Sequence, residues 1–197
     1  IATHSTGIVY VAWHENDGSD FSIICARSAD SGANWSIVTV ATGSTYRENV
    51  DIAVDRNEKI YLTWVDYDAV SSGNPIFFSS SSTQGASWTA GTRVDDRNVV
   101  VSGFSPKIGV NPAGIYIVWV DNRNGDGDIF FSESIDGGIT WGDGLLNNND
   151  IRVNDNPIGD GTLQSQPNIA VNDWGIYVIW SDERSGAISD IYFAGYE

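Results

Sequence analysis

The sequence is poor in several residue types, and each shortage narrows the class of protein. Its 197 residues include no methionine and one cysteine, and its only lysines are Lys59 and Lys107. A single cysteine excludes a disulfide framework within the chain, and the apolar neighbours of Cys25 predict a buried, inert thiol. No apolar run is long enough to span a membrane, and no helical apolar period persists over three turns. We therefore expect neither membrane insertion nor helices.

The charge is strongly one-sided. The formal net charge is −16 and the sequence pI is about 4.1. Such a surface repels phosphate backbones and anionic lipids, so nucleic acid is excluded as a partner. The composition favours an extracellular or cell-surface (secreted) protein whose ligand is a carbohydrate or another protein.

A short turn pattern, S-x-D-x-G-x-x-W, occurs three times, with Thr in place of Asp in the second copy. Its tryptophans stand at positions 35, 88 and 141, so both steps are 53 residues. A fixed period of this size indicates a repeat architecture. The conserved positions of the pattern within this chain are Ser28, Asp30, Gly32 and Trp35; Ser81, Thr83, Gly85 and Trp88; and Ser134, Asp136, Gly138 and Trp141.

A second pattern recurs in phase with the first. Four copies of an apolar strand end in tryptophan, and an acidic residue follows each at the second position: Glu15, Asp66, Asp121 and Asp182. Seven of the eight tryptophans therefore occupy repeated positions, whereas Trp174 lies in a predicted turn.

Each repeat is predicted to contain four strands, because its short runs of β-branched and aromatic residues are bounded by Gly, Asn, Asp and Ser. The strand ending in tryptophan is the second of each repeat. The first strands are expected at 1–2, 50–54, 107–110 and 168–171. The third strands are expected at 22–27, 76–80, 129–133 and 191–194. The fourth strands are expected to end with residues 38–40, 92–95 and 151–154.

The turn pattern resembles the Asp box (BNR repeat) of the sialidase-like β-propeller family, and the resemblance covers nearly the whole chain. It implies an all-β propeller of four-stranded antiparallel blades with Asp-box turns. The expected blades are 1–47, 48–104, 105–165 and an incomplete 166–197, which together form a single segment and a partial ring of about three and a half blades. Another copy, or the remainder of a longer chain, is expected to complete the propeller.

The turn pattern has a local physical explanation. The Asp carboxylate can accept hydrogen bonds from turn N–H groups, and Gly supplies a positive φ. The tryptophan is expected to pack against a neighbouring strand as an apolar anchor, in the same environment in all three copies. We expect these residues to be structural and assign no catalytic residue among them.

Function is expected where the variable loops gather. In an up-and-down meander, the repeated turns share one end of the sheets and the other loops share the opposite end, which is where ligand sites belong. One such loop contains Asn124, Asp126 and Asp128, whose alternating oxygens resemble the start of a calcium loop. The alternative is a β-turn in which Asn and Asp bond to their own backbone. Calcium is thus the cofactor to test, and no other is indicated.

The family resemblance implies what an active sialidase needs: three arginines for a carboxylate, a Tyr–Glu nucleophile pair and an acid/base Asp. The loop arginines are Arg47, Arg97, Arg123 and Arg184, of which Arg123 and Arg184 recur at one repeat position and are expected to be structural. Tyr46 and Glu48 are the nearest match to the pair. The interpretation is a non-catalytic secreted or cell-surface module for binding or assembly; the alternative is a fragment of a sialidase-like glycoside hydrolase.

Overall fold

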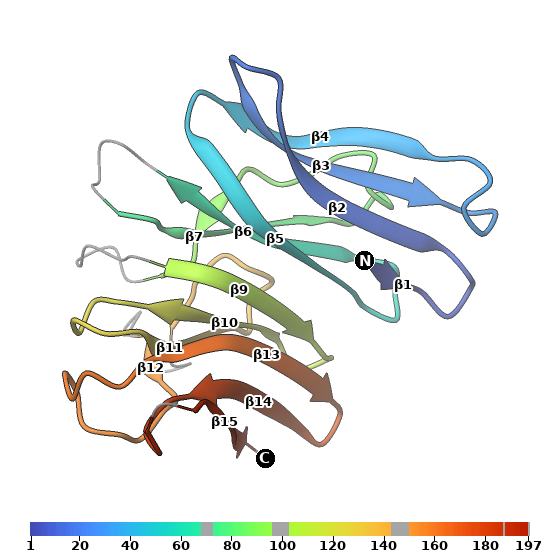
Figure 1. Cartoon of the computed structure of the whole chain (residues 1–197). Coiled ribbons are helices and arrows are strands. Elements are labelled where there is room, and N and C mark those ends of the chain that lie inside the picture. The colour runs from blue at the N-terminus through green and yellow to red at the C-terminus, as the bar shows by residue number, and fades with distance from the viewer. Residues whose placement is uncertain (68–72, 96–102, 143–149, 187, 197) are drawn as a thin grey trace.

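The computed structural model describes residues 1–67, 73–95, 103–142, 150–186 and 188–196. Every helix or strand element in these residues is a β-strand, and none of them forms a helix long and apolar enough to cross a membrane. The strands form four antiparallel sheets that follow one another along the chain (Figure 1). The all-β class predicted from the sequence is therefore confirmed.

Each sheet is a meander, in which strands that are consecutive in the sequence are hydrogen-bonded neighbours. The first sheet contains β1 (Ala2–Thr3), β2 (Val9–Asn16), β3 (Phe21–Ser28) and β4 (Ser36–Gly43). The second contains β5 (Tyr46–Val54), β6 (Ile60–Tyr67), β7 (Ile76–Ser81) and β8 (Thr92–Arg93). The third contains β9 (Gly103–Val110), β10 (Ile115–Asp121), β11 (Asp128–Ser134) and β12 (Ile151–Arg152). The fourth, within the described residues, contains β13 (Gln164–Asn172), β14 (Gly175–Asp182) and β15 (Asp190–Tyr196).

Three apolar cores lie between successive sheets, because alternate side chains along a strand point to opposite faces. Trp64 belongs to the core between the first and second sheets, Trp119 to the next and Trp180 to the last. The repeated second-strand tryptophans of the second, third and fourth sheets thus pack against the preceding sheet. Figure 1 shows the resulting stack, with the first sheet at the top and the fourth at the bottom.

The buried thiol is also confirmed. Cys25 is 3% exposed in the core between the first two sheets, and burial raises the pKa of its thiol to about 12.

The fourth strands of the second and third sheets are shorter than predicted. The sequence predicts that they end at 95 and 154, whereas β8 and β12 each contain two residues. The reason is that side chains replace the backbone ladder. Asp95 Oδ1 accepts the N–H of Ile76 (2.7 Å), and Asn154 Oδ1 accepts the N–H of Ile129 (2.8 Å).

The first strands of the second, third and fourth sheets are longer than predicted. β5, β9 and β13 each begin at least four residues earlier than the sequence indicates, and each contains a register shift relative to its partner strand. These shifts are β-bulges, which a strict period-two pattern does not reveal.

The sheets have two distinct ends. The end called here the turn end carries the turns between first and second strands and between third and fourth strands, at the right in Figure 1. The other, called here the loop end, carries the remaining connections. The three S-x-(D/T)-x-G-x-x-W turns lie together at the turn end, as the meander predicts.

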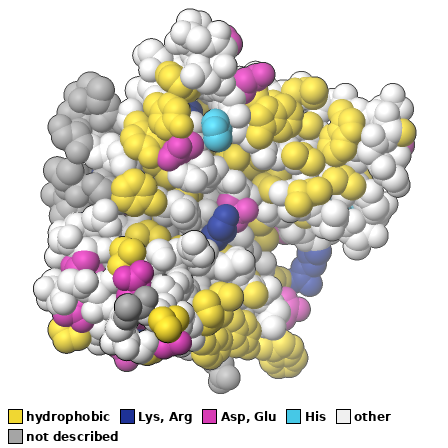
Figure 2. Space-filling view, in the orientation of Figure 1, with side chains coloured by type: hydrophobic (Ala, Val, Ile, Leu, Met, Phe, Trp, Pro, Cys, Tyr) yellow, Lys and Arg dark blue, Asp and Glu magenta, His cyan; other side chains and the backbone are white. Residues whose placement is uncertain are grey.

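The outer face of the fourth sheet is apolar and exposed. Ile191 and Phe193 are 73% and 63% exposed, whereas their repeat equivalents Ile129 and Phe131 are 0% and 4% exposed between the third and fourth sheets. Figure 2 shows hydrophobic side chains over this sheet at the bottom of the molecule. That another copy, or more of a longer chain, covers this face stays a prediction.

Candidate functional site

The first of the three repeated turns is held by its own side chains. Ser28 Oγ accepts the N–H of Gly32 (2.8 Å) and donates to Asp30 Oδ1 (2.9 Å), which also accepts the N–H of Asn34 (2.8 Å). Gly32 has a φ of 91°, which suits a residue without Cβ. The side-chain amide of Asn34, together with the other donors, lowers the pKa of Asp30 to about 2. This carboxylate is committed to the turn.

The second turn keeps the geometry without a carboxylate. Ser81 Oγ accepts the N–H of Gly85 (2.9 Å), as in the first turn. Thr83 Oγ1 accepts the N–H of Ser87 (2.8 Å), so one hydroxyl replaces the carboxylate oxygen.

The third turn has the carboxylate again. Ser134 Oγ accepts the N–H of Gly138 (2.8 Å), and Asp136 Oδ1 accepts the N–H of Thr140 (2.9 Å). The shared pattern of donors and acceptors makes the three turns a structural element of the sheets.

The three tryptophans differ in environment, contrary to expectation. Trp35 is 41% exposed and Trp141 is 7% exposed. Trp35 and Trp88 each donate their indole N–H to the carbonyl of the turn glycine (3.0 and 3.1 Å). Trp141 instead packs edge-on against Phe78 of the second sheet, with ring centroids 5.0 Å apart. The difference arises from the neighbouring sheet, because the first turn has no preceding sheet among the described residues to pack on.

The loop arginines pair with acids of their own sheets. Arg97 lies outside the described residues. The other three each bond to the acid that follows the repeated tryptophan at the second position: Arg47 with Asp66 (2.8 Å), Arg123 with Asp121 (2.6 Å) and Arg184 with Asp182 (2.7 Å). The contacts of Arg123 and Arg184 repeat between the third and fourth sheets, whereas Arg47 reaches Asp66 from β5, so each of the three guanidinium groups is already paired with an acid of the protein.

Tyr46 and Glu48 do lie together. The Tyr46 hydroxyl donates to Glu48 Oε2 (2.9 Å), and the Tyr67 hydroxyl donates to Oε1 of the same carboxylate (2.5 Å). The hydrogen bond to Glu48 raises the pKa of Tyr46, and the contact itself is the one that a nucleophilic hydroxyl makes with an adjacent base.

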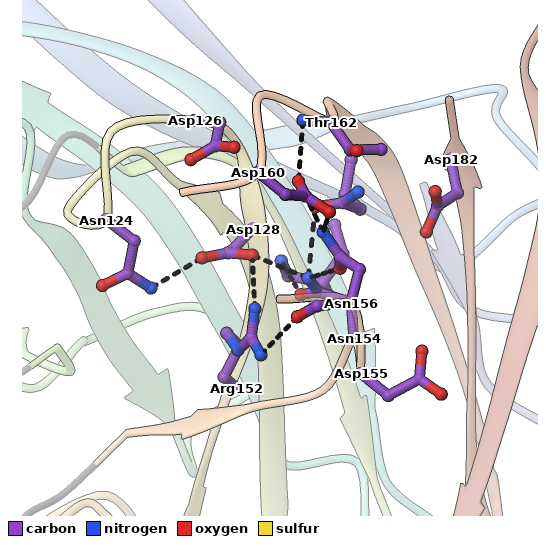
Figure 3. A network of polar contacts seen from close by, with 12 residues as sticks. Asn124, Asp126, Asp128, Arg152, Asn154, Asp155, Asn156, Asp160, Thr162 and Asp182 are labelled. Carbon is purple, nitrogen blue, oxygen red and sulfur yellow. Dashed lines mark hydrogen bonds and ion pairs between the residues drawn. The ribbon is translucent and has the colours of Figure 1, made fainter. Parts of the chain in front are cut away.

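A polar network joins the loop end of the third sheet to the segment that leads into the fourth (Figure 3). Asp128 lies at its centre. Its Oδ1 accepts from Asn154 Nδ2 (2.6 Å) and Arg152 Nη1 (3.1 Å), and its Oδ2 accepts from Asn124 Nδ2 (2.6 Å). Asp126 belongs to the same loop, and its Oδ2 accepts the N–H of Gly161 (2.7 Å).

The residues proposed as calcium ligands are therefore close together, but their side chains bond to other groups of the protein. Arg152 neutralises Asp128, and Asn124 presents its amide hydrogens to that carboxylate. Among the described residues, no three His, Cys, Asp or Glu side chains are grouped to hold a metal ion. The N–H of Gly125 bonds to the carbonyl of Asn122 (2.9 Å), which is the backbone hydrogen bond of a β-turn.

A hollow that the sequence did not indicate lies where the first strands of three sheets meet. It has a volume of about 380 Å³ and is called here the first-strand hollow. Its lining residues are Asn49, Val50, Ser105, Lys107, Gln166, Pro167 and Asn168.

Three equivalent residues of the first-strand hollow have strained backbones. Asn49, Ser105 and Gln166 have φ of 54°, 51° and 51°, each at the bulge of its strand. A left-handed conformation is unfavourable for residues with a side chain and occurs preferentially at functional sites. Three sheets thus each contribute to one hollow a polar residue whose backbone is in the left-handed conformation.

The first-strand hollow is lined by a positive charge, which is unusual for an acidic chain. Lys107 is the only charged side chain that lines it, and within the described residues Lys107 makes no ion pair. Two carboxylates on β5 flank Asn49: Glu48 Oε1 accepts from Asn49 Nδ2 (2.9 Å), and Asp51 Oδ2 accepts the N–H of Ile108 (3.0 Å).

One sequence signal marks the bulges that line this hollow. Pro106 and Pro167 occupy equivalent positions, each directly after a left-handed residue, in the segments S-P-K-I-G-V and Q-P-N-I-A-V. A proline inside a strand marks an edge or a bulge. The sequence could therefore locate the bulges but not their convergence.

Comparison with known proteins shows the fold. No family model matches the sequence, and no curated protein matches it. Solved structures do match, at 12–15% identity. An α-L-arabinanase from Penicillium chrysogenum in complex with arabinobiose has a TM-score of 0.66 at 14% identity, covering 98% of this chain and 58% of that chain.

Two further enzymes are similar. An α-L-arabinofuranosidase from Fusarium graminearum has a TM-score of 0.61 at 15% identity, covering 95% of this chain and 59% of that one. A family 43 endo-arabinanase from Bacillus licheniformis has a TM-score of 0.55 at 13% identity, covering 98% of this chain and 70% of that one. These glycoside hydrolases are β-propellers, so the chain has a propeller-type fold and spans just over half the length of the first two of these structures.

Proposed function

We propose that this chain is part of a carbohydrate-acting β-propeller of the glycoside hydrolase type, and that saccharide binds in the first-strand hollow. The observation that carries the proposal is the convergence of Asn49, Ser105 and Gln166 from three sheets. The named neighbours, which act on arabinan or arabinofuranosides by their titles, share the fold and support this class of ligand.

The residues of the hollow suit a sugar. Amide and hydroxyl side chains can donate to and accept from sugar hydroxyls, and their positions are set by strands rather than loops. Lys107 adds one donor with a positive charge.

Hydrolysis requires two carboxylates, or a tyrosine nucleophile with its partner. We assign the two carboxylate roles to Glu48 and Asp51, which flank the lining residue Asn49 on β5 without themselves lining the hollow. Glu48 accepts hydrogen bonds from two tyrosines, and Asp51 is held by the backbone of β9. Tyr46 donates to Glu48 as a tyrosine nucleophile would to its base, but Arg47, Arg123 and Arg184 are each paired with an acid of the protein, so a sialidase-type site is not favoured here.

A non-catalytic binding module is the second candidate. The engagement of Arg47, Arg123 and Arg184 by structural acids favours it over a sialidase. Under either candidate the sheets are blades, the repeated turns are Asp boxes, and the protein acts outside the cell or at its surface.

The test is saccharide binding and cleavage by the 197-residue chain. Binding of linear arabinan is measured by calorimetry, and cleavage by release of reducing ends. We expect Gln166→Ala and Lys107→Ala each to weaken binding about tenfold. Ile37→Ala removes an exposed side chain of β4 that lines neither this hollow nor the other large one, so it is the control and leaves binding unchanged.

Cleavage separates the two candidates. If the chain is catalytic, Glu48→Gln and Asp51→Asn bind arabinan but release no reducing ends. Binding without release by the unchanged protein would assign the chain to the second candidate. Unaltered binding by both hollow variants would overturn the first-strand hollow as the site.

A further inference from the structure

We propose a second saccharide-binding surface, at the turn end and separate from the first-strand hollow, built on Trp174 and the hollow beside it. This surface goes beyond the proposed function, because none of its residues lines the first-strand hollow.

Trp174 stands outside the repeated positions and on the surface. It is 83% exposed, whereas Trp64, Trp119 and Trp180 are each at most 3% exposed. An aromatic ring of this size normally contributes to stability by burial. An exposed ring in a turn gives the fold little, and its faces are open to a ligand.

The turn itself does not need tryptophan. Asn172 Oδ1 accepts the N–H groups of Trp174 (2.8 Å) and Gly175 (3.0 Å). In the equivalent turn of the third sheet, Asn111 Oδ1 accepts the N–H groups of Ala113 and Gly114 at the same distances. Alanine therefore serves at this position with unchanged geometry.

A hollow of about 580 Å³ lies against this turn. Turns of the second, third and fourth sheets line it, and Asp173, the neighbour of Trp174, is one of its lining residues. Asn111 Nδ2 donates to the carbonyl of Asn172 (2.9 Å), which ties the two turns together. The volume lies within the range of small-molecule sites.

The exposed side chains around this hollow are mainly polar. Arg56, Asn57 and Asp173 are exposed, and Ile135 is the one large apolar side chain exposed there. In the described part of the chain the Arg56 guanidinium makes no ion pair. One flat ring beside polar groups fits a sugar, which has an apolar face and a rim of hydroxyls, better than it fits an apolar protein surface.

Affinity electrophoresis tests the proposal, with linear arabinan, xylan and soluble β-glucan in separate gels. We expect at least one polysaccharide to retard the protein, and Trp174→Ala to weaken that retardation about tenfold. Because Trp174→Ala restores the residue of the equivalent turn, its melting temperature is expected to match that of the unchanged protein. Trp174→Tyr keeps a ring and should retain most of the retardation.

Two controls keep this surface distinct from the first. Ile139→Ala removes another exposed apolar side chain at the turn end and should have no effect. Gln166→Ala, in the first-strand hollow, should leave a Trp174-dependent component of binding.

Three outcomes would overturn the proposal: no polysaccharide retards the protein, Trp174→Ala is retarded as before, or Trp174→Ala changes only self-association in sedimentation. The last would assign Trp174 to a contact between copies.

Discussion

At the scale of the residue, tryptophans at equivalent positions of different repeats lie in different environments. Trp141 is buried against Phe78, whereas Trp35 is 41% exposed. The cost of removing a side chain follows the contacts and apolar area that it loses. Side chains at equivalent repeat positions therefore contribute unequally to the free energy of unfolding.

We predict that Trp141→Ala lowers the free energy of unfolding by about 3–5 kcal/mol, as for other large buried aromatics. Trp35→Ala, at the same repeat position, should cost clearly less. Urea unfolding followed by circular dichroism measures both. Equal losses from the two variants would show that the neighbouring sheet does not set the cost.

Arg152 supplies the counter-charge of Asp128 in the Asn124–Asp128 loop. Its guanidinium pairs with Asp128 Oδ1 (3.1 Å) and with the carbonyl of Asn156 (2.7 Å). While this pair is intact, Asp128 has its counter-charge within the protein.

We therefore predict equal melting temperatures in calcium and in chelator for the unchanged protein. Arg152→Met removes the counter-charge, so calcium should raise the melting temperature of that variant, since a ligand that binds only the folded state stabilises it. Differential scanning fluorimetry at fixed ionic strength makes the comparison. A calcium-dependent rise in the unchanged protein would restore the calcium site.

At the scale of the element, hydrogen bonds within the first and third repeated turns stabilise the charged form of the Asp carboxylate. The amide of Asn34 is the largest of several donors that lower the pKa of Asp30 to about 2. For Asp136, burial raises the pKa, but hydrogen bonds from Thr140, Ser134 and Ile139 outweigh it and lower the pKa to about 2. An unfolded Asp has a pKa of about 3.9.

The sign of the pH effect follows from these values. A depressed folded-state pKa contributes stability above the unfolded pKa, and this contribution is lost as pH falls through the folded pKa. We predict that the unchanged protein loses stability between about pH 4 and pH 2, and that a variant with Asp30→Asn and Asp136→Asn loses less over that window. Chemical unfolding at several pH values measures the slope.

The second turn supplies the matched variant. Thr83→Asp places a carboxylate where Ser81 and Ser87 already present their donors, so it should steepen the same pH dependence, whereas Thr83→Asn should not. Parallel slopes for all these proteins would show that the turn carboxylates do not govern acid stability.

At the scale of the whole molecule, each sheet buries both faces where it has two neighbours. Ile129 and Phe131 of the third sheet are buried against the fourth, and the equivalent Ile191 and Phe193 are exposed. A contiguous exposed apolar face, next to a strand paired on one side in the described residues, favours association.

We predict that the chain self-associates with rising concentration, and that Ile191→Ser with Phe193→Ser reduces this association. Both positions are exposed, so the substitutions should leave the melting temperature nearly unchanged. Sedimentation velocity over a range of concentrations gives the mass. A monomer at every concentration, with or without the substitutions, would show that this face needs no partner.

The sequence by itself determined the strands, their order and the repeated turns, because these depend on local chemistry. Alternating apolar residues define a strand within a few positions, and Ser28, Asp30 and Gly32 close a turn with atoms at most four residues apart. The all-β class could be predicted from this local information, and so could the placement of the repeated turns at the same end of the sheets.

The tertiary structure decided what depends on the packing of sheets. Asn49, Ser105 and Gln166 come from three sheets, and no local pattern places them around one hollow. The pairing of Asp128 with Arg152, the burial of Trp141 and the capping of Ile76 by Asp95 likewise join separate strands or loops. Each of these contacts is set by where two elements meet in space, and a sequence period carries that information only for residues within one repeat.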